Sequence, residues 1–140
     1  MKNKILIINS IYYREVSENL LIGSKKVLND KNIQLKIIDV PGALEIPVVL
    51  EKNKKKFSGF IIFGCVIRGE TSHYDLVVNV TADAVYKIVN KNLLPLAFCL
   101  LTVENYDQAI ERSHPDKKNL GEKAAQTCLN MIEILNDKKF

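Results

Sequence analysis

The chain has 140 residues, 47% of them hydrophobic, and a formal net charge of +4 at pH 7. This length can bury one sizeable core but is short for two ordinary domains, so we expect a single domain over residues 1–140. The sequence has no apolar run of membrane-spanning length and no basic-then-apolar leader, so we expect a cytoplasmic protein without a membrane partner. Lysines gather within 52–56, 117–118 and 138–139 without interleaved aromatic residues, which argues against a nucleic-acid partner.

The three cysteines, Cys65, Cys99 and Cys128, form no CxxC pair, and each lies in an apolar run. We therefore expect buried free thiols and neither disulfides nor zinc ligands. The sequence contains no Cys, His and carboxylate cluster with the spacing of metal ligands, so we also expect no metal ion.

The first half of the chain alternates between strand-like and helix-like patterns. The β-branched run at 5–8 predicts a strand, and apolar residues at helical spacing between 16 and 28 predict the helix that follows. Apolar residues at 33, 35 and 37 alternate as in a second strand. Pro41 and Gly42 then introduce a segment whose Leu44, Val48 and Val49 recur at helical intervals, so a second helix is predicted there.

The second half continues this order. The run from Phe60 to Phe63 is typical of a strand buried on both faces, and apolar positions between 76 and 89 predict an amphipathic helix. A fourth strand is predicted from about 96 to 101. Two final helices are indicated by Asn105 with Gln108 and by Asn119 with Glu122, both in the pattern of a capping box. The whole order predicts an α/β fold, a three-layer αβα sandwich around a four-stranded parallel sheet.

Ligands of such sheets bind beyond the carboxyl ends of the strands, where this sequence places residues with useful chemistry. After the predicted strands come Tyr12 and Tyr13, then 41–45, then 68–73, then Thr102. The tyrosines either cap the sheet edge or stack on a planar heterocycle. Glu45 either complements the dipole of its helix or belongs to a site.

The segment from Arg68 to His73 joins a buried strand to a helix start, where free backbone N–H groups favour an anion such as phosphate. Its Gly69 and Thr71 would suit a plain helix cap equally well. A histidine can exchange protons at physiological pH, although one at a helix start is more often a surface or packing residue. Arg112, at the end of a short helix, can offset the helix dipole or bind a phosphate.

Three segments occur together: Pro-Gly-Ala-Leu-Glu-Ile-Pro at 41–47, Gly-Cys-Val-Ile-Arg-Gly-Glu-Thr-Ser-His-Tyr-Asp at 64–75, and Gln-Ala-Ile-Glu-Arg at 108–112. In sequence, order and spacing they resemble the signature segments of lumazine synthases, and the resemblance runs from about residue 5 to 135. It implies a flavodoxin-like sheet and a transferase of riboflavin biosynthesis. That enzyme, 6,7-dimethyl-8-ribityllumazine synthase, condenses 5-amino-6-(D-ribitylamino)uracil with 3,4-dihydroxy-2-butanone 4-phosphate. It releases phosphate and water, and it requires no cofactor.

The same resemblance assigns the site residues. Tyr12 would stack on the pyrimidine and His73 would donate and accept protons. The ribityl side would meet Ala43, Leu44 and Glu45, and the uracil edge would meet the backbone of Cys65, Val66 and Ile67. Glu70 and Thr71 would cradle the sugar phosphate. The adjacent subunit would contribute Phe98 to the heterocycle and Arg112 to the phosphate.

The family also implies a homo-oligomer, either a pentamer or a 60-subunit icosahedral shell, with riboflavin synthase as a further candidate partner. The length from Arg112 to Gly121 favours the shell. One departure from the family is Leu120, where Asn-Lys-Gly is common and this chain has Asn119-Leu120-Gly121. Two alternatives stay open: the related archaeal-type riboflavin synthase, and a non-catalytic shell protein that binds lumazine or flavin.

Overall fold

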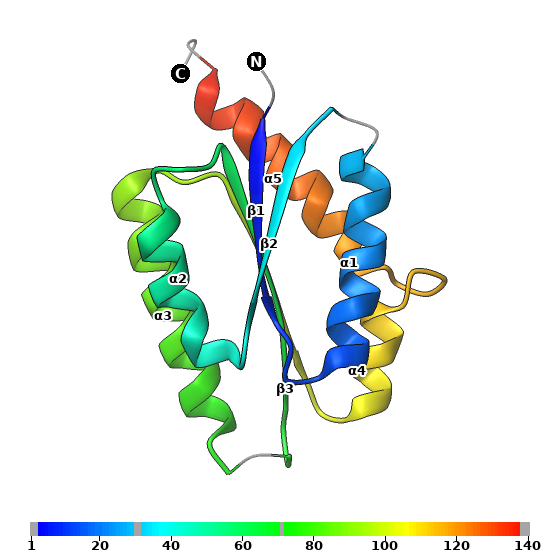
Figure 1. Ribbon diagram of the computed structural model, residues 1–140. Helices are drawn as coiled ribbons and strands as arrows, with labels where there is room; N and C mark the ends of the chain where they lie inside the picture. The colour runs from blue at the N-terminus through cyan, green and yellow to red at the C-terminus, as the bar shows by residue number, and fades with distance from the viewer. Residues whose placement is uncertain (1–2, 30–31, 71, 138–140) are drawn as a thin grey trace.

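Four parallel strands form the middle layer of the computed structural model, which describes residues 3–29, 32–70 and 72–137. The strands are β1 (Lys4–Ser10), β2 (Gln34–Val40), β3 (Gly59–Ile67) and β4 (Leu96–Val103), in the order β2-β1-β3-β4. One face is covered by α1 (Arg14–Leu28), α4 (Tyr106–Ser113) and α5 (Leu120–Asn136) (Figure 1). The other is covered by η2 (Ala43–Glu45), α2 (Ile46–Asn53) and α3 (Tyr74–Asn92). The predicted three-layer, flavodoxin-like sandwich is confirmed.

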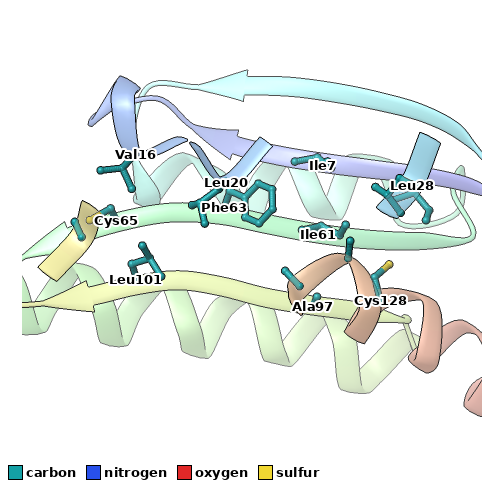
Figure 2. Close-up of a cluster of buried hydrophobic side chains, with 14 of the residues drawn as sticks. Ile7, Val16, Leu20, Leu28, Ile61, Phe63, Cys65, Ala97, Leu101 and Cys128 are labelled. Carbon is teal, nitrogen blue, oxygen red and sulfur yellow. The ribbon is translucent and has the colours of Figure 1, made fainter. Parts of the chain in front are cut away.

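Two apolar clusters hold the layers together, one on each face of the sheet. Figure 2 shows the first, in which Phe63 and Ile61 of β3 lie among Leu20 and Leu28 of α1 and Cys128 of α5. All nine residues of β3 are buried, including the predicted run from Phe60 to Phe63, because helices cover both faces of this central strand. Burial of each large aliphatic side chain contributes about 1.5–3 kcal/mol, so the two clusters supply the main favourable term that holds the helices against the sheet.

Several element boundaries differ from those expected, and β1, β2 and β3 continue beyond their predicted runs to Ser10, Val40 and Ile67. The segment after Pro41 begins as the short 3₁₀ turn η2 and becomes α-helical only at Ile46, and β4 continues two residues further, to Val103. The cap at Asn105 is confirmed, since its Oδ1 accepts a hydrogen bond of 2.9 Å from the backbone N–H of Gln108. Gln108 Oε1, however, reaches the backbone N–H of Glu104, one residue before the expected Asn105.

The capping box expected at Asn119 is wrong. Asn119 precedes α5 in the left-handed region at φ 49°, and its side chain accepts no hydrogen bond from the helix backbone. Its Nδ2 instead donates to Glu122 Oε2 at 2.6 Å, and its Oδ1 is buried against Gly23 of α1. The side chain therefore fills the contact between α1 and α5, which sequence spacing alone does not reveal.

The cysteines agree with expectation in being free thiols. Cys65 and Cys128 are buried, and Cys99 is half-buried. Burial raises the pKa of each thiol from its ordinary 9.0 to about 12, although the N–H of Phe60 partly opposes this for Cys128. Within the described residues, no helix is both long and apolar enough to cross a membrane.

Candidate active site

A cleft of about 340 Å³ opens at the carboxyl ends of β1 and β3. In Figure 1 these ends lie at the bottom. The described residues that line the cleft come from four chain segments: Tyr12, Tyr13, Pro41, Gly42, Ala43, Leu44, Glu45, Cys65, Val66, Ile67, Glu70 and Val77. A site at this edge is what the parallel topology predicts.

Two tyrosines from the turn between β1 and α1 form one wall. Tyr12 is 71% exposed, and its ring meets that of Tyr13 edge to face with centroids 5.0 Å apart. Tyr13 packs against the core on its other side, near the ring of Tyr106, whose hydroxyl donates to Glu15 Oε2 at 2.6 Å. Burial, and then the charge of Glu70, raise the pKa of the Tyr13 phenol, so this group stays a neutral donor in the cleft. The ring of Tyr12 is therefore exposed to a ligand, and the contact with Tyr13 holds it against the core.

The opposite wall is the turn between β2 and α2. Gly42 is extended, and its carbonyl accepts a hydrogen bond of 3.3 Å from the backbone N–H of Glu45. This turn buries Ala43 and leaves Leu44 and Glu45 exposed at the cleft. The wall therefore combines an apolar side chain with a carboxylate that a polyol could bind.

The floor of the cleft is the last part of β3. β1 pairs with β3 only as far as Asn9 and Phe63, whereas β4 stays paired with it to Ile67. From Cys65 to Ile67, β3 therefore has a strand partner on one side only, among the residues described. We call the unpaired side of residues 65–67 the half-free edge of β3. It lies in the cleft, where its backbone N–H and C=O groups can form hydrogen bonds with a ligand in place of a neighbouring strand.

The loop between β3 and α3 continues the site. Gly69 adopts φ 89°, a left-handed conformation in which a side chain would be strained, and Glu70 then lines the cleft. Arg68 fastens the loop: its Nε lies 3.2 Å from Glu104 Oε1, and its guanidinium lies 4.3 Å from the centre of the Tyr74 ring. Thr71 lies outside the described residues.

Three predicted site residues do not line this cleft. His73 is exposed at the N-cap of α3. Phe98 lies on the α3 face of β4, where its ring meets Tyr86 at 5.4 Å. Arg112 lies in the last turn of α4, half-buried, and its Nη1 donates to Gln108 Oε1 at 3.4 Å. One subunit therefore gathers eight of the predicted residues in its cleft: Tyr12, Ala43, Leu44, Glu45, Cys65, Val66, Ile67 and Glu70.

The cleft also contains Val77, which sequence reasoning did not assign to a site. It contains Tyr13 as well, for which the sequence left open whether the ring caps the sheet edge or stacks on a ligand. Val77 fits the apolar pattern of α3 and nothing in the sequence separates it from a core residue. Leu120 is half-buried and packs against the core on the α1 side of the sheet.

No group of three or more His, Cys, Asp and Glu side chains within 3–29, 32–70 and 72–137 is arranged to hold a metal ion. The groups that line the cleft suit an organic ligand. They are the rings of two tyrosines, the half-free edge of β3, and the carboxylates of Glu45 and Glu70.

Fold and cleft together define an α/β protein with a cleft at the carboxyl ends of its parallel strands, the edge at which sheets of this kind bind ligands. The sequence model of the 6,7-dimethyl-8-ribityllumazine synthase family matches residues 2–136. Curated proteins with that name are similar over nearly the whole chain. One from Bartonella tribocorum is 39% identical over 136 residues, covering 95% of this chain and 90% of the relative. Others are 40% identical in Bartonella bacilliformis (93% and 88% covered) and 36% identical in Agrobacterium fabrum (95% of each).

The chain belongs to the 6,7-dimethyl-8-ribityllumazine synthase family, as the three sequence segments predicted. This is a family of transferases in riboflavin biosynthesis, so the expectation of an enzyme is confirmed. The family acts on small-molecule substrates and forms homo-oligomers.

Proposed function

We propose that this protein condenses 5-amino-6-(D-ribitylamino)uracil with 3,4-dihydroxy-2-butanone 4-phosphate, forming 6,7-dimethyl-8-ribityllumazine, phosphate and water. The observation that supports this best is the half-free edge of β3 in the cleft. A uracil ring carries donors and acceptors along one edge, and the backbone from Cys65 to Ile67 can pair with them. Tyr12 stands beside this edge with an open ring on which the pyrimidine can stack.

The remaining walls suit the rest of the two substrates. The ribityl chain has hydroxyl groups that can donate to Glu45, while Ala43 and Leu44 contact its carbons. Glu70, on the loop that leads into α3, would face the sugar phosphate together with Thr71, its neighbour in the sequence, and the start of that helix favours an anion.

The chemistry needs two substrates held in register and repeated proton transfers. The amine attacks the ketone and water leaves to give an imine, phosphate is eliminated, and ring closure onto the remaining carbonyl releases a second water. His73 is our candidate for taking up and returning the protons. Alignment of two reactants can contribute ~7–11 kcal/mol to catalysis, against ~3–5 kcal/mol for a general acid–base, so the walls of the cleft matter more than any one group.

The positions of Phe98 and Arg112 favour a site shared between subunits. Both lie outside the cleft of their own chain, so they would serve the cleft of a neighbour. The surface of α3 supports close assembly: only Thr81 and Val85 of its 19 residues are buried, and Leu76, Val80 and Tyr86 are exposed. We propose a pentamer, with the 60-subunit shell as its larger form, a cytoplasmic location, and riboflavin synthase as a candidate partner.

Steady-state turnover with both substrates tests the activity directly. We expect lumazine formation, followed by its absorbance, only when the aminouracil and the sugar phosphate are present together. Turnover of lumazine itself to riboflavin would favour the archaeal-type riboflavin synthase. Lumazine binding without turnover of any substrate would favour the non-catalytic shell protein.

A complementation experiment tests the shared site. His73→Ala and Arg112→Ala variants are prepared separately, mixed in equal amounts, unfolded and refolded together. Random mixing would leave about a quarter of the sites with His73 from one subunit and Arg112 from the next, so activity should recover. No recovery, with mixed assemblies demonstrated by mass spectrometry, would show that each subunit holds a complete site.

A further inference from the structure

Gln108 holds the guanidinium of Arg112 through an oxygen that is itself fixed. Its Oε1 accepts one hydrogen bond from the backbone N–H of Glu104 at 2.8 Å and another from Arg112 Nη1 at 3.4 Å. An amide oxygen has two lone pairs, so it can accept both. The two side chains are four residues apart in α4, which places them one above the other on the same helix face.

Two further hydrogen bonds hold Gln108 and Glu104, the residues that supply and bind this oxygen. The backbone N–H of Gln108 donates to Asn105 Oδ1 at 2.9 Å, and the carboxylate of Glu104 receives Arg68 Nε at 3.2 Å. Gln108 Oε1 is therefore anchored to the end of β4 and, through Arg68, to the loop beside the cleft.

The group that accepts the hydrogen bond from Arg112 is an amide oxygen, which carries no net charge. Within the part of the chain that the structure describes, Arg112 forms no ion pair; the adjacent Glu111 pairs with Lys117, Oε2 to Nζ 3.7 Å. A carboxylate at 108 would hold the guanidinium too, but it would offset the positive charge that binds an anion. An amide restricts the long side chain and leaves its full charge and its other N–H donors to a ligand.

We propose that Gln108 is a positioning residue for Arg112: its amide oxygen, anchored by Glu104, orients the guanidinium toward the sugar phosphate without neutralising it. This inference rests on the proposed role of Arg112 in phosphate binding.

The test compares Gln108→Leu and Gln108→Glu with wild type, measuring kcat, both KM values, and inhibition by inorganic phosphate. Gln108→Leu removes the acceptor, so the KM for the sugar phosphate and the inhibition constant of phosphate should rise roughly 5- to 20-fold. The KM for the aminouracil should stay within about twofold. Gln108→Glu keeps an acceptor for the backbone N–H of Glu104 but adds a negative charge, so this variant should bind phosphate more weakly than wild type. The difference should shrink as the pH falls toward the pKa of a glutamate carboxyl group.

Tyr106→Phe is the matched control, because it removes a hydrogen bond at the same end of α4, from the Tyr106 hydroxyl to Glu15, and leaves the acceptor and the anchoring contacts of Gln108 in place. It should lower the melting temperature without a selective change in the KM for the sugar phosphate. The inference is overturned if Gln108→Leu changes both KM values equally, or neither, or if its effect persists in full on top of Arg112→Ala.

Arg112→Ala alone separates this inference from the proposed function. An unchanged KM for the sugar phosphate in that variant would remove the role of Arg112, and the inference with it. A raised KM in Arg112→Ala together with normal kinetics in Gln108→Leu would overturn only the role of Gln108.

Discussion

Gly121 in α5 lies against the backbone carbonyl of Leu20 in α1, so closely that a methyl group at this position would overlap the carbonyl oxygen. Alanine in place of a helical glycine ordinarily stabilises by about 0.5–1 kcal/mol. Here we expect the opposite sign: Gly121→Ala should lower the free energy of unfolding by about 1–3 kcal/mol, because the two helices must separate. Urea unfolding measures this, and the exposed Thr127→Ala in the same helix serves as the control. A stabilised Gly121→Ala would mean that the helices separate without cost.

The three thiols predict a loss of stability in alkaline solution. Their pKa values are raised to about 12 in the folded protein, against 9.0 ordinarily. Above about pH 9 the unfolded chain therefore releases protons that the folded chain retains, and the free energy of unfolding should fall as pH rises. Each thiol contributes at most about 1.4 kcal/mol per pH unit. Unfolding at pH 7.5, 9 and 10 checks this, and Cys128→Ala should show a shallower decline than wild type.

His73 and Arg112 have different proposed roles, so their alanine variants should change different kinetic parameters. His73→Ala should lower kcat by roughly ten- to a thousand-fold and leave substrate binding largely intact. Arg112→Ala should raise the KM for the sugar phosphate and also slow turnover, with the KM for the aminouracil changing least. Near-normal kinetics in both variants would mean that His73 serves only at the start of α3 and that Arg112 only complements the dipole of α4.

The ring of Tyr12 can be tested without disturbing the fold, because it is 71% exposed. Tyr12→Phe keeps the ring face and should behave like wild type. Tyr12→Ala should raise the KM for the aminouracil roughly 3- to 10-fold at an unchanged melting temperature, since one stacking contact is lost. Equal kinetics in the two variants would show that the pyrimidine binds elsewhere.

The absence of a cofactor remains a prediction. Activity should survive exhaustive treatment with a chelator, because the proposed condensation involves no redox step and needs no Lewis acid. The measurement is steady-state turnover before and after dialysis against chelator. Activity that is lost and then restored by an added divalent metal would contradict it.

The sequence predicted the elements that carry strong periodicity and the edge of the sheet at which they meet. β3 was recognisable because its run from Phe60 to Phe63 is continuously apolar, as is typical of a strand with helices on both faces, and the cleft followed from parallel topology. Asn119 was misread because its side chain fills a contact between α1 and α5, which lie about one hundred residues apart in the chain. Val77 could not be distinguished from core residues, because helical spacing shows which face is apolar but not which turn of that face borders a cavity.

Phe98 packs in the α3 layer of its own subunit and does not line the cleft of that subunit. Under the proposed function, a lone chain would have the fold without the complete set of groups that binds both substrates. The concentration of working sites would then follow the law of mass action for subunit association. Specific activity, which for a self-contained enzyme is independent of dilution, should fall once the protein is diluted below the dissociation constant of its assembly, and the two substrates should oppose that fall by binding across the contact.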